Sequence, residues 1–135
     1  MRKLNVLIAG STGYIGVQLI KLLLNHRYIK IKYLCGNSSV GKKISSFDKS
    51  LKAKNLPKII RFNKKFLKDV DIIFTALPNG EAQNISKLLL NHRYIKIKYL
   101  CGNSSVGKNI SSFDKSVKAK NLPKIIRFNN TFYYW

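Results

Sequence analysis

Acidic residues are what this sequence lacks most. Five Asp and Glu stand against 26 Lys and Arg among 135 residues, which gives a formal net charge of +21. Residues 21–63 hold 11 bases and one acid, and residues 87–129 hold ten bases and one acid. A surface this basic binds polyanions non-specifically at low salt. However, the lysines are spread through an element pattern, as Lys30 and Lys32 are along Ile29–Tyr33, which argues against an evolved nucleic-acid-binding tail.

Cysteines and long apolar runs are also scarce. The two cysteines, Cys35 and Cys101, occupy equivalent positions of a repeated segment, so they indicate neither a disulfide pair nor a metal site. This usage favours a reducing, cytoplasmic setting. The apolar run Asn5–Ala9 follows two bases but ends at Gly10, which is too short for a signal peptide or a membrane span. We therefore predict no metal and no membrane partner.

A large part of the chain is present twice. Residues 21–63 recur at 87–129 with 41 of 43 positions identical, and the two differences are Lys43 against Asn109 and Leu51 against Val117. Structural repeats diverge at solvated positions while they keep an apolar pattern. Here loops, surface lysines and apolar residues are copied alike, which indicates a recent duplication.

The duplication divides the chain into three parts. We expect residues 1–86 to carry the inherited function, residues 87–129 to be a near-identical copy, and residues 130–135 to form a divergent, poorly packed aromatic tail. Two equivalent strands for one place in a sheet invite register errors, self-association and domain swapping. A non-functional product of gene rearrangement stays open as an alternative.

Apolar spacing predicts alternating strands and helices. The continuous run Leu4–Ala9 predicts a strand covered on both faces. Tyr14–Asn25 has helical spacing, and Tyr28–Cys35 alternates as a strand with one wetter face. The expected buried face of the helix comprises Ile15, Leu19, Leu22 and Leu23, with Ile20 and Leu24 adjoining, and that of the strand comprises Ile29, Ile31 and Tyr33.

The pattern continues with a polar loop over Gly36–Leu56 and strands at Ile59–Phe62 and Asp71–Leu77. Asn79 is a good N-cap for a further helix with Ala82, Ile85, Leu88 and Leu89 on its buried face. This order predicts the α/β class, with a Rossmann-like, mostly parallel sheet and flanking helices, incomplete and extended by the duplicated segment. We expect the copied strand Tyr94–Cys101 to take the next place in the sheet, whereas Lys124–Phe128 has no obvious place.

A glycine-rich turn lies between the first strand and the first helix. Gly10 allows a tight turn, Gly13 a close approach of backbone to phosphate, and Gly16 close packing of helix on strand. The alternative is an ordinary strand-to-helix turn that happens to contain glycine. We predict that a pyrophosphate binds at the residues of this turn: Gly10, Ser11, Thr12, Gly13, Tyr14, Ile15 and Gly16.

The end of the second strand lacks the acidic residue that accepts ribose hydroxyls in NAD sites. Residues 36–43 offer amides, hydroxyls and cations, which suit the 2′-phosphate of NADP, and Asn37, Ser38 and Ser39 are the predicted contacts. The alternative is a solvated loop whose lysines touch nothing. The stretch also approximates a P-loop, but Lys43 stands where Ser or Thr must hold Mg²⁺, so we reject that interpretation.

Four segments resemble the nucleotide-binding half of N-acetyl-gamma-glutamyl-phosphate reductase, in the semialdehyde dehydrogenase superfamily. They are the glycine turn 10–16, the helix end Leu22–His26, the loop Ser38–Ser45, and Thr75–Gly80, which is similar to that family's Ala-Leu-Pro-His-Gly segment with Asn79 in place of His. The resemblance covers residues 1 to about 86. It implies NADP as the cofactor, with Leu77 and Pro78 along it near the nicotinamide.

The resemblance implies reduction of an acyl phosphate to a semialdehyde in arginine biosynthesis, through a cysteine thiolate of a second domain. No residue of this chain matches that cysteine or its histidine, so we expect at most NADP(H) binding and no catalytic residue. Cys35 and Cys101, and likewise His26 and His92, are interpreted as structural. The copy begins at Lys21, after the glycines, so it creates no second cofactor site. A basic nucleic-acid or polyanion binder remains the alternative function.

Overall fold

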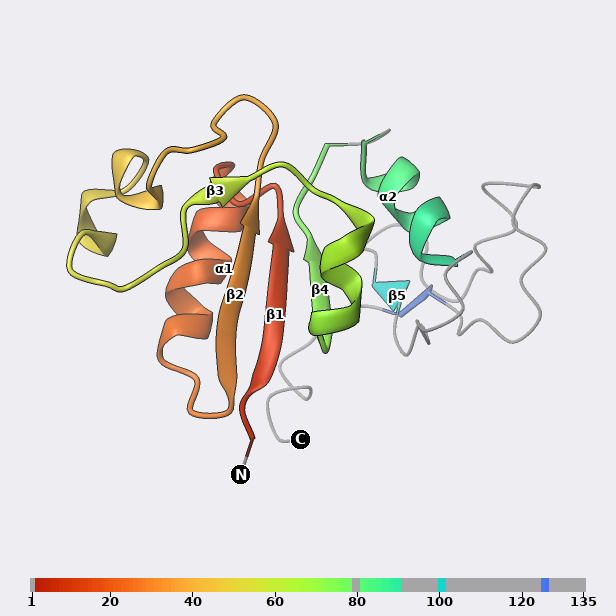
Figure 1. The fold of residues 1–135 in the computed structure, drawn as a ribbon, viewed down its shortest axis with the longest axis horizontal. Helices are drawn as coiled ribbons and strands as arrows, with labels where there is room; N and C mark the ends of the chain where they lie inside the picture. The colour runs from red at the N-terminus through yellow and green to blue at the C-terminus, as the bar shows by residue number, and fades with distance from the viewer. Residues whose placement is uncertain (1, 79–80, 91–99, 102–124, 127–135) are drawn as a thin grey trace. The chain divides into compact units, whose positions relative to one another are not determined.

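The computed structural model describes residues 2–78, 81–90, 100–101 and 125–126, in two compact units, Met1–Ala82 and Gln83–Trp135. The first unit contains a four-stranded sheet of β1 (Leu4–Ala9), β2 (Ile29–Cys35), β3 (Ile59–Ile60) and β4 (Ile72–Thr75) (Figure 1). Its order is β3-β2-β1-β4 and every neighbouring pair is parallel. This order is half of a doubly wound sheet, which confirms the predicted Rossmann-like fold.

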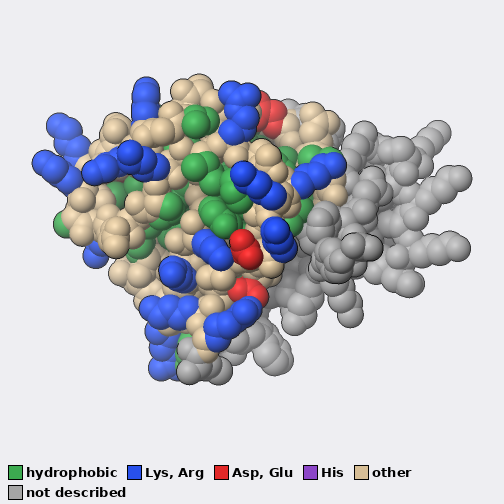
Figure 2. Space-filling model, in the orientation of Figure 1, with side chains coloured by type: hydrophobic (Ala, Val, Ile, Leu, Met, Phe, Trp, Pro, Cys, Tyr) green, Lys and Arg blue, Asp and Glu red, His purple; other side chains and the backbone are tan. Residues whose placement is uncertain are grey.

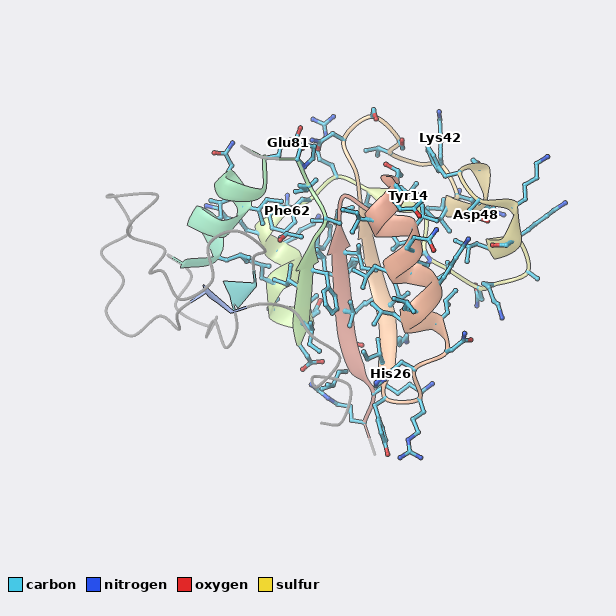
Figure 3. All side chains as sticks on the ribbon, turned by 180° about the vertical axis from the view of Figure 1, so that it is seen from behind. Tyr14, His26, Lys42, Asp48, Phe62 and Glu81 are labelled. Atoms are coloured by element: carbon cyan, nitrogen blue, oxygen red, sulfur yellow. The ribbon has the colours of Figure 1, made fainter. Side chains whose placement is uncertain are left out.

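The central strand β1 is buried on both faces, as its unbroken apolar run predicts. Val6, Leu7 and Ile8 are each 0% exposed. The helix α1 (Tyr14–Leu24) covers one face of the sheet (Figure 3), and the 3₁₀ segment η3 (Lys64–Asp69) lies over the other (Figure 1). Covering both faces satisfies the requirement of a parallel sheet for burial.

The buried face of α1 differs from the predicted one. Ile15 is 68% exposed and Leu22 is 60% exposed, so the prediction was wrong for these two residues. Leu23 and Ile20 are buried as predicted, together with Gly16 and Val17. The helix is rotated because Gly16 lets its first turn lie directly on the glycine turn, where a larger residue has no room.

The strict alternation predicted for β2 is also interrupted. The register with β1 shifts between Val6 and Leu7, whose partners are Ile31 and Tyr33. Beyond this irregularity Leu34 packs with Ile31 in the core cluster on α1, while Tyr33 stacks on Phe66 of η3 at 4.6 Å between ring centroids. A β-bulge adds one residue to a strand and so reverses the faces of those that follow. Tyr33 was therefore assigned to the wrong face.

The polar loop between β2 and β3 contributes to the core. It contains two 3₁₀ turns, η1 (Ile44–Ser46) and η2 (Lys49–Leu51), which sequence inspection missed. Ile44 and Leu51 are 2% and 3% exposed and belong to the core cluster. Two isolated apolar residues among polar ones carry no helical or strand period, so their burial was not apparent.

The second unit contains a separate pair of short strands. The helix α2 (Glu81–Leu90) spans the boundary between the units, and β5 (Leu100–Cys101) pairs in parallel with β6 (Ile125–Ile126). The expectation that the copied strand adds to the first sheet is wrong for these residues, and 124–128 does contain a pairing strand. Asn79 and the tail 130–135 lie outside the described residues. Among the described residues, no helix is long and apolar enough to cross a membrane.

Candidate nucleotide-binding site

The glycine turn is fixed to the end of β2 by one carbonyl group. The backbone N–H groups of Gly10 and Ser11 donate to the Cys35 carbonyl oxygen at 3.0 and 3.1 Å. The Ser11 hydroxyl, which is fully buried, donates to the same oxygen at 3.1 Å. The turn therefore has a rigid base, and the predicted contact Ser11 faces inward rather than toward a ligand.

The three glycines of the turn meet different steric conditions. A Cβ at Gly10 would lie 2.2 Å from the Ala76 carbonyl oxygen, and Gly10 has φ of +81°, which disfavours other residues. A Cβ at Gly16 would lie 2.1 Å from the Gly10 carbonyl oxygen. At Gly13 the nearest atom would be 3.7 Å away, in ordinary contact. The fold therefore requires Gly10 and Gly16 but leaves Gly13 free.

The first turn of α1 presents open backbone donors. Gly13 is the N-cap, with φ −73° and ψ 165°, and it has no side chain to cap the helix. No acidic residue lies in the first turn. The first N–H groups of a helix lack partners within it and carry partial positive charge, which favours an anion. Gly13, Tyr14 and Ile15 are exposed here, whereas Gly16 is buried.

The loop after β2 lies beside the turn. The Gly36 N–H donates to the Ile60 carbonyl oxygen at 3.0 Å, and the Thr12 side chain lies 3.8 Å from where a Gly36 Cβ would stand. The predicted contacts Asn37 and Ser38 are exposed, but Ser39 is only 5% exposed. The Ser39 carbonyl oxygen accepts from the Lys42 N–H at 3.1 Å, so Ser39 shapes the loop.

The segment after β4 reaches the same edge of the sheet. The Ala76 N–H donates to the Ala9 carbonyl oxygen at 2.8 Å and continues the ladder beyond Thr75. Leu77 is half-buried, with its Cδ2 atom 3.1 Å from where a Gly10 Cβ would stand, and Pro78 is exposed. The predicted contacts of the turn and of residues 77–78 thus meet between β1 and β4. Strand order reverses at this point, which is where open α/β sheets bind ligands.

Glu81 is a residue of this edge that sequence reasoning missed. The Asn37 side-chain amide donates to the Glu81 Oε2 atom at 3.3 Å, across 44 residues of sequence. Figure 3 places Glu81, Tyr14 and Lys42 toward the carboxyl ends of the strands and His26 at the opposite end. The sequence predicts Glu81 near a helix N-terminus, but only the fold brings it to the loop after β2.

Cys35 and His26 both have surroundings that favour a structural role. Cys35 is 2% exposed, and burial raises the pKa of its thiol to about 12, so it remains protonated. The His26 Nδ1 atom accepts from the Tyr28 N–H at 3.3 Å, in the turn between α1 and β2. His26 lies at the opposite end of the sheet from the edge where the glycine turn, Asn37 and Leu77 meet (Figure 3).

The parallel sheet, the glycine turn after β1 and the open helix terminus together define a Rossmann-like nucleotide-binding domain. The family described as "Semialdehyde dehydrogenase, NAD binding domain" matches residues 5–87. The chain belongs to this family, which confirms the resemblance seen in the sequence.

Individual relatives extend the match. The N-acetyl-gamma-glutamyl-phosphate reductase of Ehrlichia ruminantium is 35% identical over 137 residues, which cover 98% of this chain and 39% of that protein. The malonyl CoA reductase (NADP) of Metallosphaera sedula is 38% identical over 87 residues, 60% of this chain and 24% of that protein. The chain thus spans about two-fifths of the length of the Ehrlichia ruminantium protein.

A solved structure shares the fold. The aspartate semialdehyde dehydrogenase of Candida albicans, solved with NADP, matches 95% of this chain and 43% of that chain, with a TM-score of 0.57 and 21% identity. The match to the Ehrlichia ruminantium protein, which covers 98% of this chain, runs past residue 86, where the resemblance was expected to end.

Proposed function

We propose that the first unit binds NADP(H) as the cofactor domain of an enzyme of the N-acetyl-gamma-glutamyl-phosphate reductase type. The observation that carries the proposal is the uncapped N-terminus of α1, held against β2 through the Cys35 carbonyl. Its open amides suit a pyrophosphate, and Gly13 leaves room for the closest approach. Bound NADPH would supply a hydride, and the residues of this unit would bind and orient it.

The charge around the loop after β2 supports NADP over NAD. Lys42 and Lys43 are exposed on the same loop as the exposed Asn37 and Ser38. The first acid that follows, Asp48, is engaged by the Lys21 ammonium at 2.6 Å. Cations and amide donors favour a phosphate at the ribose 2′ position, whereas NAD sites present a carboxylate there.

The proposed overall reaction is that of the Ehrlichia ruminantium relative, whose match covers 98% of this chain. We extend to this protein the NADPH-dependent reduction of an acyl phosphate to a semialdehyde, in arginine biosynthesis. The contribution of the described residues is cofactor binding. We assign no catalytic role to Cys35, because a thiolate is the reactive form and burial keeps this thiol protonated.

The basic surface supports a second candidate, a polyanion binder. Lys and Arg side chains are distributed over the face seen in Figure 2, with few acidic side chains between them. Such binding is electrostatic and falls steeply with salt. It does not depend on the geometry of the glycine turn, so the two candidates respond differently to a change at Gly13.

The test is a titration of the whole chain with NADPH and NADH at about 150 mM salt, following nicotinamide fluorescence. Saturable binding that prefers NADPH and is lost in Gly13→Glu supports the proposal. Gln18→Glu is the matched control, since it adds the same charge at an exposed position of α1 outside the turn. Binding that survives Gly13→Glu but disappears with added salt identifies a polyanion binder instead.

A further inference from the structure

The second unit repeats a pairing of the first. In the first sheet Leu34 pairs with Ile59 and Cys35 with Ile60. In the second unit Leu100 pairs with Ile125 and Cys101 with Ile126, also in parallel. These are the equivalent residues of the two copies, so β5 and β6 reproduce the register of β2 and β3.

The copied segment carries the core side chains that the original supplies. Leu34, Ile44, Leu51 and Ile59 are buried in the core cluster of the first unit. Their counterparts in the copy are Leu100, Ile110, Val117 and Ile125. Three of the four are identical, and the fourth differs by one methylene group. The other difference, Lys43 against Asn109, falls at an exposed position.

The backbone hydrogen bonds that β2 makes do not favour one copy of the segment over the other. Six residues of β1 pair with β2, and the Cys35 carbonyl accepts from Gly10 and Ser11 through its backbone oxygen. Any strand of the same sequence can make these bonds. A two-stranded sheet is marginal in water by itself, so the two described residue pairs of β5 and β6 add little stability of their own.

From these observations we propose that the copied β5–β6 element is interchangeable with β2–β3 and takes its place beside β1 when the first copy is impaired. Among the four core positions, the two copies differ at one, where the first has Leu51 and the second has Val117. Losing one buried methylene costs about 0.5–1.5 kcal/mol, which corresponds to a preference for the first copy of about tenfold at most. The first copy therefore predominates in the sheet of the unaltered chain, and the second copy takes its place in a minor fraction of molecules.

Three variants of the full chain test the exchange: Leu34→Asp, Leu100→Asp and the double variant. An aspartate in place of the fully buried Leu34 removes that copy from the core. We expect the Leu34→Asp variant to keep a cooperative thermal transition, with a midpoint lowered by about 4–8 °C. We expect Leu100→Asp to keep the wild-type midpoint, and the double variant to lose the transition.

A repair variant separates exchange from simple tolerance of the aspartate. Val117→Leu should raise the midpoint of Leu34→Asp, because it restores the missing methylene, and should leave the wild-type midpoint unchanged. Thiol labelling in a Cys35→Ala background provides a second readout, since exchange requires Cys101 to become protected in Leu34→Asp. Loss of cooperative unfolding in Leu34→Asp alone, or failure of Val117→Leu to raise its midpoint, overturns the proposal.

Discussion

Replacing Gly13 with aspartate should stabilise the protein while it abolishes nucleotide binding. Gly13 is the N-cap of α1 and already has the extended backbone conformation that capping residues adopt. Its added Cβ meets no atom closer than 3.7 Å, so the change introduces no clash. The new carboxylate would accept hydrogen bonds from the first-turn N–H groups, which no side chain now caps.

The magnitude of each effect follows from this geometry. Aspartate is a better N-cap than glycine by a few tenths of a kcal/mol, and a negative charge at a helix N-terminus adds about 0.3–1 kcal/mol. We therefore expect a rise in Tm of about 2–6 °C for a unit of this size. The same carboxylate occupies the pyrophosphate donors. Losing two charge-assisted hydrogen bonds costs about 3 kcal/mol, or more than 100-fold in Kd.

The assay combines thermal unfolding without ligand and NADPH titration of the same samples. Gly16→Ala is the contrasting variant, because its Cβ would lie 2.1 Å from the Gly10 carbonyl oxygen. It should lower the free energy of unfolding by about 1–3 kcal/mol or more. A fall in Tm for Gly13→Asp, or an unchanged Kd for NADPH, would refute the assignment of this helix terminus as an open anion site.

Three further predictions concern titratable groups. Hydrogen bonds from Lys21, and then from Ser50, lower the pKa of Asp48 from 3.8 to about 2. Folding favours the charged form of Asp48, so this carboxylate stabilises the folded state above about pH 4, and the stabilisation is lost as pH falls toward 2. The Tm difference between wild type and Asp48→Asn should therefore disappear over that range. Burial raises the pKa of Cys35 from 9.0 to about 12. Burying the neutral thiol therefore stabilises the folded state below pH 9, and this stabilisation is lost as pH rises toward 12. In a Cys101→Ser background, a thiol reagent should label native protein far more slowly than denatured protein, and equal rates would contradict this burial. Finally, Glu81→Gln should improve NADPH binding about three- to tenfold relative to NADH, because it removes a negative charge 3.3 Å from Asn37, the proposed 2′-phosphate contact; an unchanged ratio of the two Kd values would show that Glu81 does not sense the phosphate.

Much of the site could be predicted because its determinants are local. Glycines at 10, 13 and 16 directly after an apolar run specify a strand, a tight turn and a helix, and the structure has this order. The resemblance to the family likewise rests on short contiguous segments, of which the glycine turn is one of four between residues 10 and 80. The different space available to a Cβ at Gly10, Gly13 and Gly16 could not be predicted in the same way, because it depends on atoms of Ala76 and of the turn itself.

Long-range relations account for the predictions that were wrong. The bulge in β2 arises from its register with β1, and it moves Tyr33 to the face of Phe66. Ile44 and Leu51 enter the core because the loop packs them in the same cluster as Val17, Ile20 and Leu23 of α1. The apolar period of β2 or of the loop depends only on the residues of that segment. It therefore does not show which residues of other segments will pack against it.

The sequence by itself determined the α/β class, the glycine turn, the absence of an acid after β2 and the recurrence of residues 21–63 at 87–129, because backbone freedom, apolar period, charge and residue identity can be read from the chain without its partners in space. The tertiary structure decided which face of α1 is buried, that Glu81 lies beside Asn37, and that the described strands of the copy pair with each other in the register of β2 and β3. Those outcomes depend on packing and strand register between residues that lie far apart in the chain.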